Sequence, residues 1–449
     1  MNMIYNVDDK VPFRKNIVFA IQQLLAIIAA TLLVPTLVNL TYGEEILNQA
    51  AALFGAGAGT LVYILFTRKK SPVFLGSSFA FISPLASACV FGYCGIILGA
   101  IIAGAVYVVI AIVIKAAGTG WVDKLMPKVI IGPTVALIGL SLCASAVNNL
   151  NNTAVGDYSL ISILCGVFAF VVTCLASVKG NKTMKAIPFI IGIAAGYILA
   201  TILTLIGNAA NVDALKVIDF TPIVNNFVPF KITSLFDLPK FTFVGAITEG
   251  FTKVGGWAGV AQVAVLFAPV ALVVFAEHIA DHKNLSSIIG KDLVKDPGLD
   301  KTLLGDGVGS IVGSIFGGCP NTTYGECIGC VAITGDASVY TVMLTSILCM
   351  ELAFFTPFIA FVNTIPVCII GGICIALYGF ISVSGLKMIQ DVDLNDNRNL
   401  FVVATILVTG IGGLTLNFGS ITFTSIATAL ILGIIVNVIL GAGKNKKEN

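Results

Sequence analysis

Two clusters of ionisable side chains lie within long apolar stretches of this sequence, at residues 276–282 and 324–326. In the first cluster, Glu277 and Asp281 are four residues apart, so a helix would place both carboxylates on one face. In the second, Glu326 lies among Gly and Thr residues that leave backbone amides free beside it. Ionisable groups within a membrane are costly and are functional candidates by default. We therefore predict that Glu277 and Glu326 bind a ligand and protons, in preference to forming a structural buried pair.

Two histidines accompany the first cluster. His278 and His282 are also four residues apart, on a helix face rotated by about 100° from the carboxylates. Zinc proteases place a glutamate between such histidines, whereas here Glu277 precedes the first one and no third ligand is apparent. We therefore predict no metal site, and we interpret both histidines as packing and hydrogen-bonding residues at the interfacial, cytoplasmic end of a helix. The sequence also lacks a dinucleotide fingerprint, a Walker A motif and a nucleophile constellation, so we expect no cofactor and no enzyme.

The elements that must position these groups are apolar helices. Of the 449 residues, 57% are hydrophobic and 11% are charged, against about 25% charged in soluble proteins. Runs of about 20 apolar residues recur along the chain, and each can span a bilayer. We therefore predict an all-α polytopic membrane protein with about fourteen transmembrane segments. The predicted spans are residues 16–39, 46–66, 73–90, 94–115, 128–147, 158–178, 184–208, 258–282, 301–318, 320–335, 337–361, 366–386, 399–417 and 420–441.

The third and tenth of these segments are interrupted. Residues 74–84 read FLGSSFAFISP and residues 320–329 read PNTTYGECIG, with polar and small residues where hydrocarbon is expected. Non-helical backbone at membrane depth is tolerated only where it is buried in protein or lines a cavity, and paired interruptions point to a transporter's binding site. The motif P-x-x-I-I-G at 127–132 recurs at 366–371. The two interrupted segments are seven segments apart, and so are the two segments that begin with this motif. Because seven is an odd number, the second copy must be inverted in the membrane, so we predict a 7+7 inverted repeat.

Two further features of the apolar segments are interpreted as structural. Segment 301–318 carries a glycine at every fourth position, which is typical of close helix packing rather than of a ligand site. These glycines are Gly305, Gly309, Gly313 and Gly317. Asp306 in the same segment and Glu351 in the middle of segment 337–361 are acids in apolar surroundings. We expect each of them to make a structural hydrogen bond.

The basic residues predict the orientation of the chain. All Lys and Arg residues except four fall in the termini or in alternate loops, and cytoplasmic loops retain such residues. The four exceptions, Lys216, Lys231, Lys240 and Lys253, all lie in the long loop at 209–256. We therefore predict a multi-pass protein of the cell membrane with both termini in the cytoplasm.

Several motifs together resemble the nucleobase–ascorbate transporter family, also called nucleobase:cation symporter-2, and its uracil-transporting members in particular. They are LGSSFAFISP at 75–84, KAAGTGW at 115–121, AEH at 276–278, and the stretch from KDLVKDPGLDKTLLGDG to PNTTYGE at 291–326. The resemblance implies a core domain (16–115 and 258–361) and a gate domain (123–208 and 366–441). It also implies short strands in segments three and ten, and a homodimer.

The same resemblance implies a site. The two base-binding glutamates of the family map onto Glu277 and Glu326, and its base-contacting backbone amides map onto Phe79 and Gly325, with Tyr324 adjacent. The chain departs from the family at two positions. Where uracil permeases place a histidine four residues after the first glutamate, this chain has Asp281, followed by His282; where the family usually has asparagine after the second glutamate, it has Cys327.

The chemistry of these residues suits the implied substrate. Uracil is a flat neutral ring with two N–H donors and two carbonyl acceptors, so carboxylates accept from it and free amides donate to it. A carboxylate among apolar residues resists ionisation, which makes Glu277 or Asp281 a plausible proton carrier, with His282 as a further candidate.

We therefore predict import of uracil by proton symport in the lipid membrane, without nucleic acid as a partner. The alternatives are a xanthine or purine permease of the same family, or an anion transporter of similar inverted-repeat fold.

Overall fold

The apolar stretches of the sequence form helices in the computed structural model, which describes residues 3–118, 120–121, 126–151, 158–390, 392–418 and 421–441. Because hydrocarbon offers no hydrogen-bond partners, a spanning segment satisfies its backbone groups internally as a helix. Within these described ranges, eight helical runs are long and apolar enough to cross a membrane. They are α1 (Phe13–Tyr42), α2 (Gln49–Phe66), the run Phe79–Ala117, the run Lys128–Asn151, α8 (Leu160–Lys179), α10 (Pro188–Ala210), α13 (Gly256–Ile289) and α18 (Val367–Ile389).

Every predicted segment has a counterpart among these runs and the shorter helices. The run Phe79–Ala117 contains the third and fourth segments, as the elements η1 (Phe79–Phe81), α3 (Ile82–Ala88), η2 (Cys89–Phe91) and α4 (Gly92–Ala117). The run Lys128–Asn151 comprises α6 (Lys128–Ser141) and α7 (Cys143–Asn151). The remaining segments are α14 (Leu299–Gly317), α15 (Gly325–Thr334), α16 (Val339–Leu352) with α17 (Thr356–Val362), α19 (Asn397–Ile411) and α20 (Ser425–Gly441).

Short elements connect the segments. Two helices and three single 3-10 turns make up the long loop at 209–256: η3 (Asp213–Leu215), α11 (Thr221–Phe227), η4 (Ile232–Ser234), α12 (Thr242–Glu249) and η5 (Thr252–Val254). Further connecting elements in the part of the chain that the structure describes are α9 (Lys182–Ala186) and η6 (Val294–Gly298). The helices α6 and α18 both begin directly after the proline of a P-x-x-I-I-G motif, at Pro127 and Pro366. The inverted repeat itself stays a prediction, which this equivalence supports.

The two interrupted segments meet as a two-stranded antiparallel sheet. Strand β1 (Leu75–Ser77) pairs with β2 (Asn321–Thr323), with Leu75 opposite Thr323 and Gly76 opposite Thr322. Both strands are fully buried. Two more backbone bonds extend the pairing, from the amide of Tyr324 to the carbonyl of Phe74 and from Ser78 to Pro320. The short strands expected in segments three and ten are therefore confirmed.

A second two-stranded sheet, a hairpin near the C-terminal end, was not predicted. Strand β3 (Leu416–Phe418) pairs antiparallel with β4 (Ile421–Phe423), where the sequence led us to expect the ends of two apolar helices at 399–417 and 420–441. In residues 415–418 and again in residues 420–423, Thr, Asn or Ser alternates with apolar residues, which is a strand pattern of period two. The high overall hydropathy of the region concealed it.

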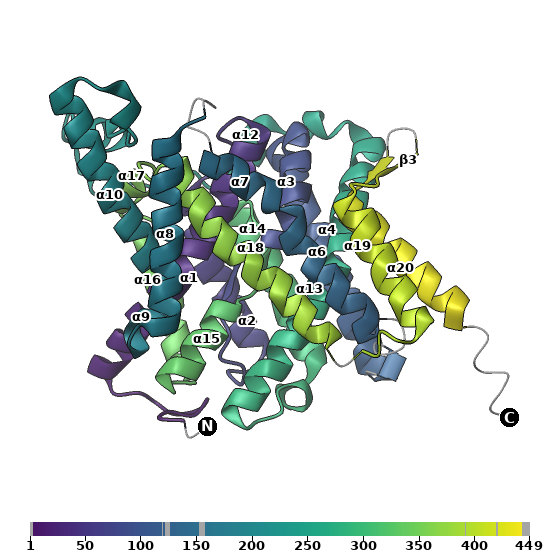
Figure 1. Ribbon diagram of the computed structural model, residues 1–449. Helices are drawn as coiled ribbons and strands as arrows, with labels where there is room; N and C mark the ends of the chain where they lie inside the picture. The colour runs from purple at the N-terminus through teal and green to yellow at the C-terminus, as the bar shows by residue number, and fades with distance from the viewer. Residues whose placement is uncertain are drawn as a thin grey trace, which may run out of the picture.

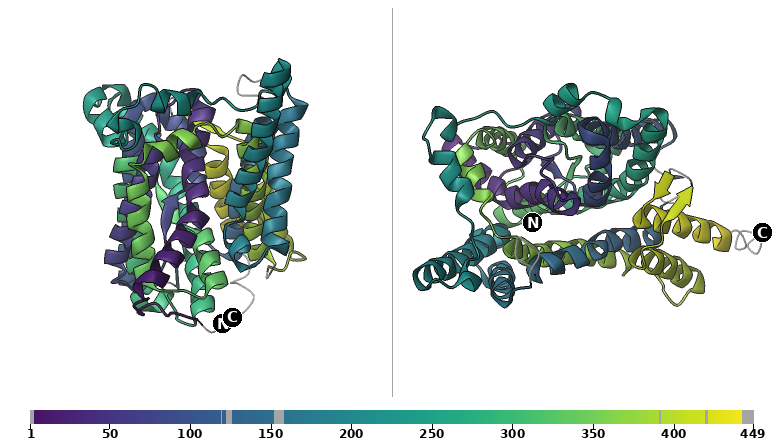
Figure 2. Two further views of the ribbon diagram at one scale, coloured as in Figure 1. Left: turned by 90° about the vertical axis from the view of Figure 1, so that its left-hand side faces the viewer. Right: turned by 90° about the horizontal axis from the view of Figure 1, so that it is seen from above.

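The helices pack as two groups that lie side by side (Figure 2, right). In the first group, α14 packs extensively against α2 and α4, and α16 packs against α1 and α2. In the second, α18 packs against α6, α7 and α8, while α19 packs against α6 and α20. The groups contact each other where α13 meets α6 and α20, and where α9 meets α15 and α1.

The glycines of α14 allow the closest helix contacts of the first group, as the sequence predicted. A Cβ added at Gly309 would lie 2.6 Å from the carbonyl oxygen of Gly59, and one at Gly317 would lie 2.6 Å from the Cα of Ala52. On the partner helix, a Cβ at Gly55 would strike the carbonyl of Gly313. Such contacts between backbones are available only to small residues.

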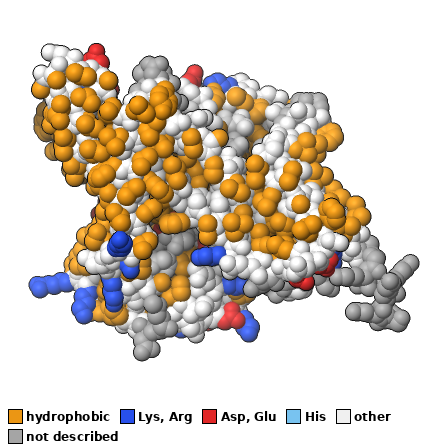
Figure 3. Space-filling model, in the orientation of Figure 1, with side chains coloured by type: hydrophobic (Ala, Val, Ile, Leu, Met, Phe, Trp, Pro, Cys, Tyr) orange, Lys and Arg blue, Asp and Glu red, His pale blue; other side chains and the backbone are white. Residues whose placement is uncertain are grey.

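The surface suits a membrane. Apolar side chains cover the upper and middle parts of the face in Figure 3, and Lys and Arg gather at its lower end. The start of α1 and the end of α20 lie at that same end, whereas α12 of the long loop lies at the opposite end (Figures 1 and 2). This distribution supports the predicted orientation, with the Lys- and Arg-rich end in the cytoplasm.

The contact between α2 and α14 yields a test of stability. Gly55→Ala should destabilise the protein by about 1–3 kcal/mol, because its Cβ meets backbone atoms that cannot move aside. Gly379→Ala in α18 is the matched control, since a Cβ there meets no atom within 4 Å. Thermal unfolding of the detergent-purified variants measures the difference, and equal melting temperatures for the two would contradict the proposed backbone contact.

Candidate functional site

A cavity of about 360 Å³ lies between the two helix groups. The first group contributes η1, α13, β2 and the start of α15, which carry Phe79, Glu277, Asp281 and residues 322–326. The second group contributes α6, α9, α10 and α18. The structure thus brings together around one cavity every residue predicted for the site except His282.

The sheet positions this part of the site. Strand β2 ends at Thr323, and α15 begins at Gly325 without a side-chain cap, so the amides of its first turn are left without an intrahelical partner. Tyr324 lies between them and donates its hydroxyl to the carbonyl of Ser77 at 2.9 Å, which anchors it to β1. A Cβ added at Gly325 would meet no atom within 4 Å, so the backbone at the helix start is open to a ligand.

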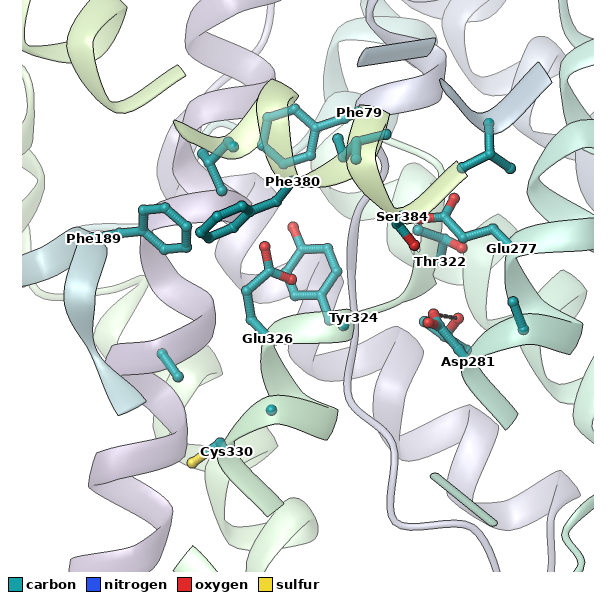
Figure 4. A pocket seen from close by; sticks show the side chains of 18 of the residues that line it. Phe79, Phe189, Glu277, Asp281, Thr322, Tyr324, Glu326, Cys330, Phe380 and Ser384 are labelled. Carbon is teal, nitrogen blue, oxygen red and sulfur yellow. Dashed lines mark hydrogen bonds between the residues drawn. The ribbon is translucent and has the colours of Figure 1, made fainter. Parts of the chain in front are cut away.

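Three carboxylates line the cavity. Glu326 and Glu277 project into it from opposite sides in the view of Figure 4, and each is only partly buried. Asp281, one helical turn after Glu277, accepts a hydrogen bond from the hydroxyl of Thr323 at 2.6 Å. The arrangement offers hydrogen-bond acceptors from three carboxylates and donors from a helix N-terminus, with Phe79 as an aromatic wall.

The histidines lie behind the cavity. The packing and the hydrogen bonds expected of them are present, but their expected place at the end of a helix is wrong. Helix α13 continues to Ile289 rather than ending near residue 282, so both side chains are fully buried between helices. His278 Nδ1 lies 2.7 Å from a carboxylate oxygen of Asp306, and His278 Nε2 lies 3.0 Å from the hydroxyl of Thr302. The structural hydrogen bond expected for Asp306 is therefore present.

The contacts of His282 settle its tautomer. Its Nδ1 lies 2.8 Å from the carbonyl oxygen of His278, which can only accept, so Nδ1 carries the proton. Its Nε2 then accepts from the hydroxyl of Tyr63 at 2.7 Å, and that hydroxyl also lies 2.7 Å from the hydroxyl of Ser71. Both ring nitrogens of His282 are thus occupied by partners in the first helix group.

Cys327 occupies the position where the sequence departs from the family signature. It is fully buried directly after Glu326, and its sulfur accepts from Gln23 Nε2 at 2.8 Å and from the amide of Phe74 at 3.3 Å. Gln23 in turn accepts from the hydroxyl of Thr345 at 3.1 Å. Cys327 therefore connects α15 to α1 and to the residue preceding β1, and does not face the cavity.

The expectation for Glu351 is wrong. Helix α16 ends at Leu352, so Glu351 lies at a helix end and is exposed instead of lying in the middle of a segment. Its carboxylate makes no hydrogen bond or ion pair with the residues that the structure describes.

The sequence did not predict the side of the cavity that α18 of the second helix group forms. On α18, Leu377, Phe380, Ser384 and Met388 follow one another at intervals of three or four residues and line the cavity on a single helix face. This helix is apolar on nearly every side, so no periodic contrast marks the face in the sequence. Thr322 was also missed, although it belongs to the interrupted segment that the sequence singled out.

The buried pair behind the cavity yields a second test. His278→Leu should lower the free energy of unfolding by about 3–5 kcal/mol, because Asp306 would be left buried without its partner. The double variant His278→Leu/Asp306→Leu should recover much of this loss, since no ionisable group then remains unpaired. Thermal or denaturant unfolding measures both, and a double variant less stable than the single one would argue against the pairing.

Comparison with known proteins agrees with this architecture. Residues 14–418 match the model of a family described as the Permease family. The chain is 34% identical over 452 residues to the uracil permease of Bacillus caldolyticus, covering 99% of this chain and 96% of that protein. It is 32% identical over 437 residues to the uracil permease of Escherichia coli K12, covering 96% and 93%.

A solved structure shares the fold at low sequence identity. The transmembrane domain of a cyanobacterial bicarbonate transporter matches with a TM-score of 0.61 and 13% identity, covering 96% of this chain and all of that domain. The relatives that match in sequence are permeases and not enzymes. The chain therefore belongs to this permease family, as its motifs predicted, and the protein is a multi-pass membrane transporter.

Proposed function

We propose that the protein imports uracil across the cell membrane by proton symport. The observation that carries the proposal is the cavity in which Glu277 lies opposite the uncapped N-terminus of α15, whose first turn carries Gly325 and Glu326. The two carboxylates accept hydrogen bonds from the two ring N–H groups, and the backbone amides of Phe79 and Gly325 donate to the ring carbonyls. Phe79 covers a face of the ring. The uracil permeases among the relatives support this choice of base.

A xanthine or purine permease remains the nearest alternative, because a purine also presents N–H and carbonyl groups on its edges. Competition of labelled uracil uptake by xanthine, thymine and cytosine separates these substrates. An anion transporter is disfavoured by charge, since three carboxylates line the cavity and the basic residue among its described lining, Lys185, is exposed on α9. An anion would need compensating cations where acids lie.

The two helix groups serve as the core and gate domains of the transport cycle. The core domain corresponds to α1–α4 with α13–α17, and the gate domain to α6–α10 with α18–α20. The cavity extends toward the Lys- and Arg-rich end, because its lining includes Lys185 of α9 and Met388 near the end of α18. On the other side Phe79 packs edge-on against Tyr378, with ring centroids 6.0 Å apart. This geometry supports a state open toward the cytoplasm, with both termini on that side.

The proton is held by Glu277 and Asp281. They lie one helical turn apart and both line the cavity, so a proton shared between them avoids two like charges at close range. His282 is less suited to this role, because both its nitrogens are engaged by Tyr63 and by a backbone carbonyl outside the cavity.

A substitution of Glu326 tests the proposed binding of uracil. Glu326→Gln should weaken uracil binding roughly tenfold to a hundredfold, because a charge-assisted hydrogen bond worth about 1.5–3 kcal/mol is lost. Equilibrium binding to purified protein measures the change. Glu351→Gln is the matched control, since Glu351 is exposed and lies outside the cavity. Unchanged affinity in Glu326→Gln would remove this residue from the site.

Coupling is tested at Asp281. Asp281→Asn should retain uracil binding and lose accumulation driven by an imposed pH gradient, because the amide keeps an acceptor for Thr323 but cannot release a proton. Glu277→Gln should damage both, because Glu277 also accepts from the base. Binding and gradient-driven uptake are measured side by side. Accumulation by Asp281→Asn at the wild-type level would assign coupling to Glu277 alone or to His282.

A further inference from the structure

Thr322 presents a buried hydroxyl that has no partner. Its side chain is 3% exposed, it lines the cavity, and its Oγ1 makes no hydrogen bond with the residues that the structure describes. A buried hydroxyl without a partner costs stability, and in a native structure it calls for an explanation. In Figure 4 the Thr322 side chain is drawn on the same side of the cavity as Glu277.

The pleat of β2 separates Thr322 from its neighbours. Side chains alternate along a strand, so Asn321 and Thr323 share one face and Thr322 has the other. Both neighbours are engaged: Asn321 Nδ2 donates to the carbonyl of Gly55 at 3.2 Å, and the hydroxyl of Thr323 donates to Asp281 at 2.6 Å. Only the middle residue of the strand keeps a free donor, and it is opposite Gly76, which has no side chain to satisfy it.

The hydrogen-bonding groups of uracil leave room for this donor. Two carboxylates satisfy the two ring N–H groups, and the backbone amides of Phe79 and Gly325 each donate to a ring carbonyl. A carbonyl oxygen has two lone pairs, so each carbonyl can accept from a second donor. The Tyr324 hydroxyl is committed to Ser77 and the Thr323 hydroxyl to Asp281. Ser384 also lines the cavity, but it belongs to α18 in the other helix group.

We propose that the hydroxyl of Thr322 donates a hydrogen bond to a ring carbonyl of the substrate and so contributes to base specificity. The proposal rests on the proposed function. It adds a side-chain donor on β2 to the backbone donors at Phe79 and Gly325 and to the acceptors on α13 and α15, so that all the proposed contacts to the ring edge come from the first helix group.

The variant Thr322→Val separates this role from a structural one. Replacing an unpartnered buried hydroxyl with a methyl group should leave the melting temperature of the substrate-free protein unchanged or raised. Uracil affinity should nevertheless fall about threefold to tenfold, the equivalent of one neutral hydrogen bond. Thr322→Ser keeps the donor and should bind uracil as the wild type does.

Thr428→Val is the matched control. Thr428 on α20 is likewise fully buried with an unpartnered Oγ1, but it does not line the cavity. Its substitution should leave uracil affinity unchanged. Thiouracils locate the contact, because sulfur is a weak acceptor: of 2-thiouracil and 4-thiouracil, the one with sulfur at the contacted carbonyl should bind wild type and Thr322→Val equally.

The outcomes are distinct. Wild-type protein that fails to bind uracil overturns the proposed function and the role of Thr322 with it. Wild-type protein that binds uracil, with Thr322→Val unchanged in affinity, overturns the role of Thr322 alone. An equal loss in Thr428→Val, or a loss in Thr322→Val accompanied by a lower melting temperature and no rescue by serine, would show that the hydroxyl is structural.

Discussion

The pairing of β1 with β2 is the constraint on which the rest of the site depends. Within hydrocarbon an unpaired backbone amide or carbonyl costs several kcal/mol, so a chain can leave the helical conformation there only if another segment completes its hydrogen bonds. Each three-residue strand supplies the backbone hydrogen-bond partners that the other lacks, and both strands are fully buried. This pairing permits α3 and α15 to begin within the protein interior, and it presents the free amides of α15 to a cavity rather than to lipid or water.

Close helix packing keeps that pairing dry and rigid. The backbones of α2 and α14 touch through glycines, and Asn321 of β2 reaches across this contact to the carbonyl of Gly55. Behind the cavity, the pair formed by His278 and Asp306 occupies α13 and α14 without using any group that faces the ligand. The polar groups of α13 therefore have two separate roles. His278, paired with Asp306, fixes the helix against its neighbour, and the adjacent Glu277 remains available to the ligand.

The sequence predicted those features that leave a local chemical signature. Charged residues in an apolar helix marked Glu277, and the break in hydrophobicity marked the two strands. The sequence could not show how far α13 extends, because the polar residues after His282 look like a loop. It also could not mark the cavity face of α18, which is apolar on nearly every side, or the β3–β4 hairpin, which follows the apolar helix α19 after a few residues. These features depend on which neighbour covers each residue, and that is a property of the folded chain.

The cavity is chemically asymmetric, and this asymmetry bears on transport. The carboxylates, the helix N-terminus and Thr322 all belong to the first helix group, whereas α18 contributes mainly Leu377, Phe380 and Met388. A substrate held by directional hydrogen bonds to one group need not exchange them when the groups move, because apolar contacts to the other are non-directional and slide at little cost. Hydrogen bonds divided between both groups would have to break at each step. The division of polar and apolar walls therefore suits movement of one group, with its bound substrate, along the other.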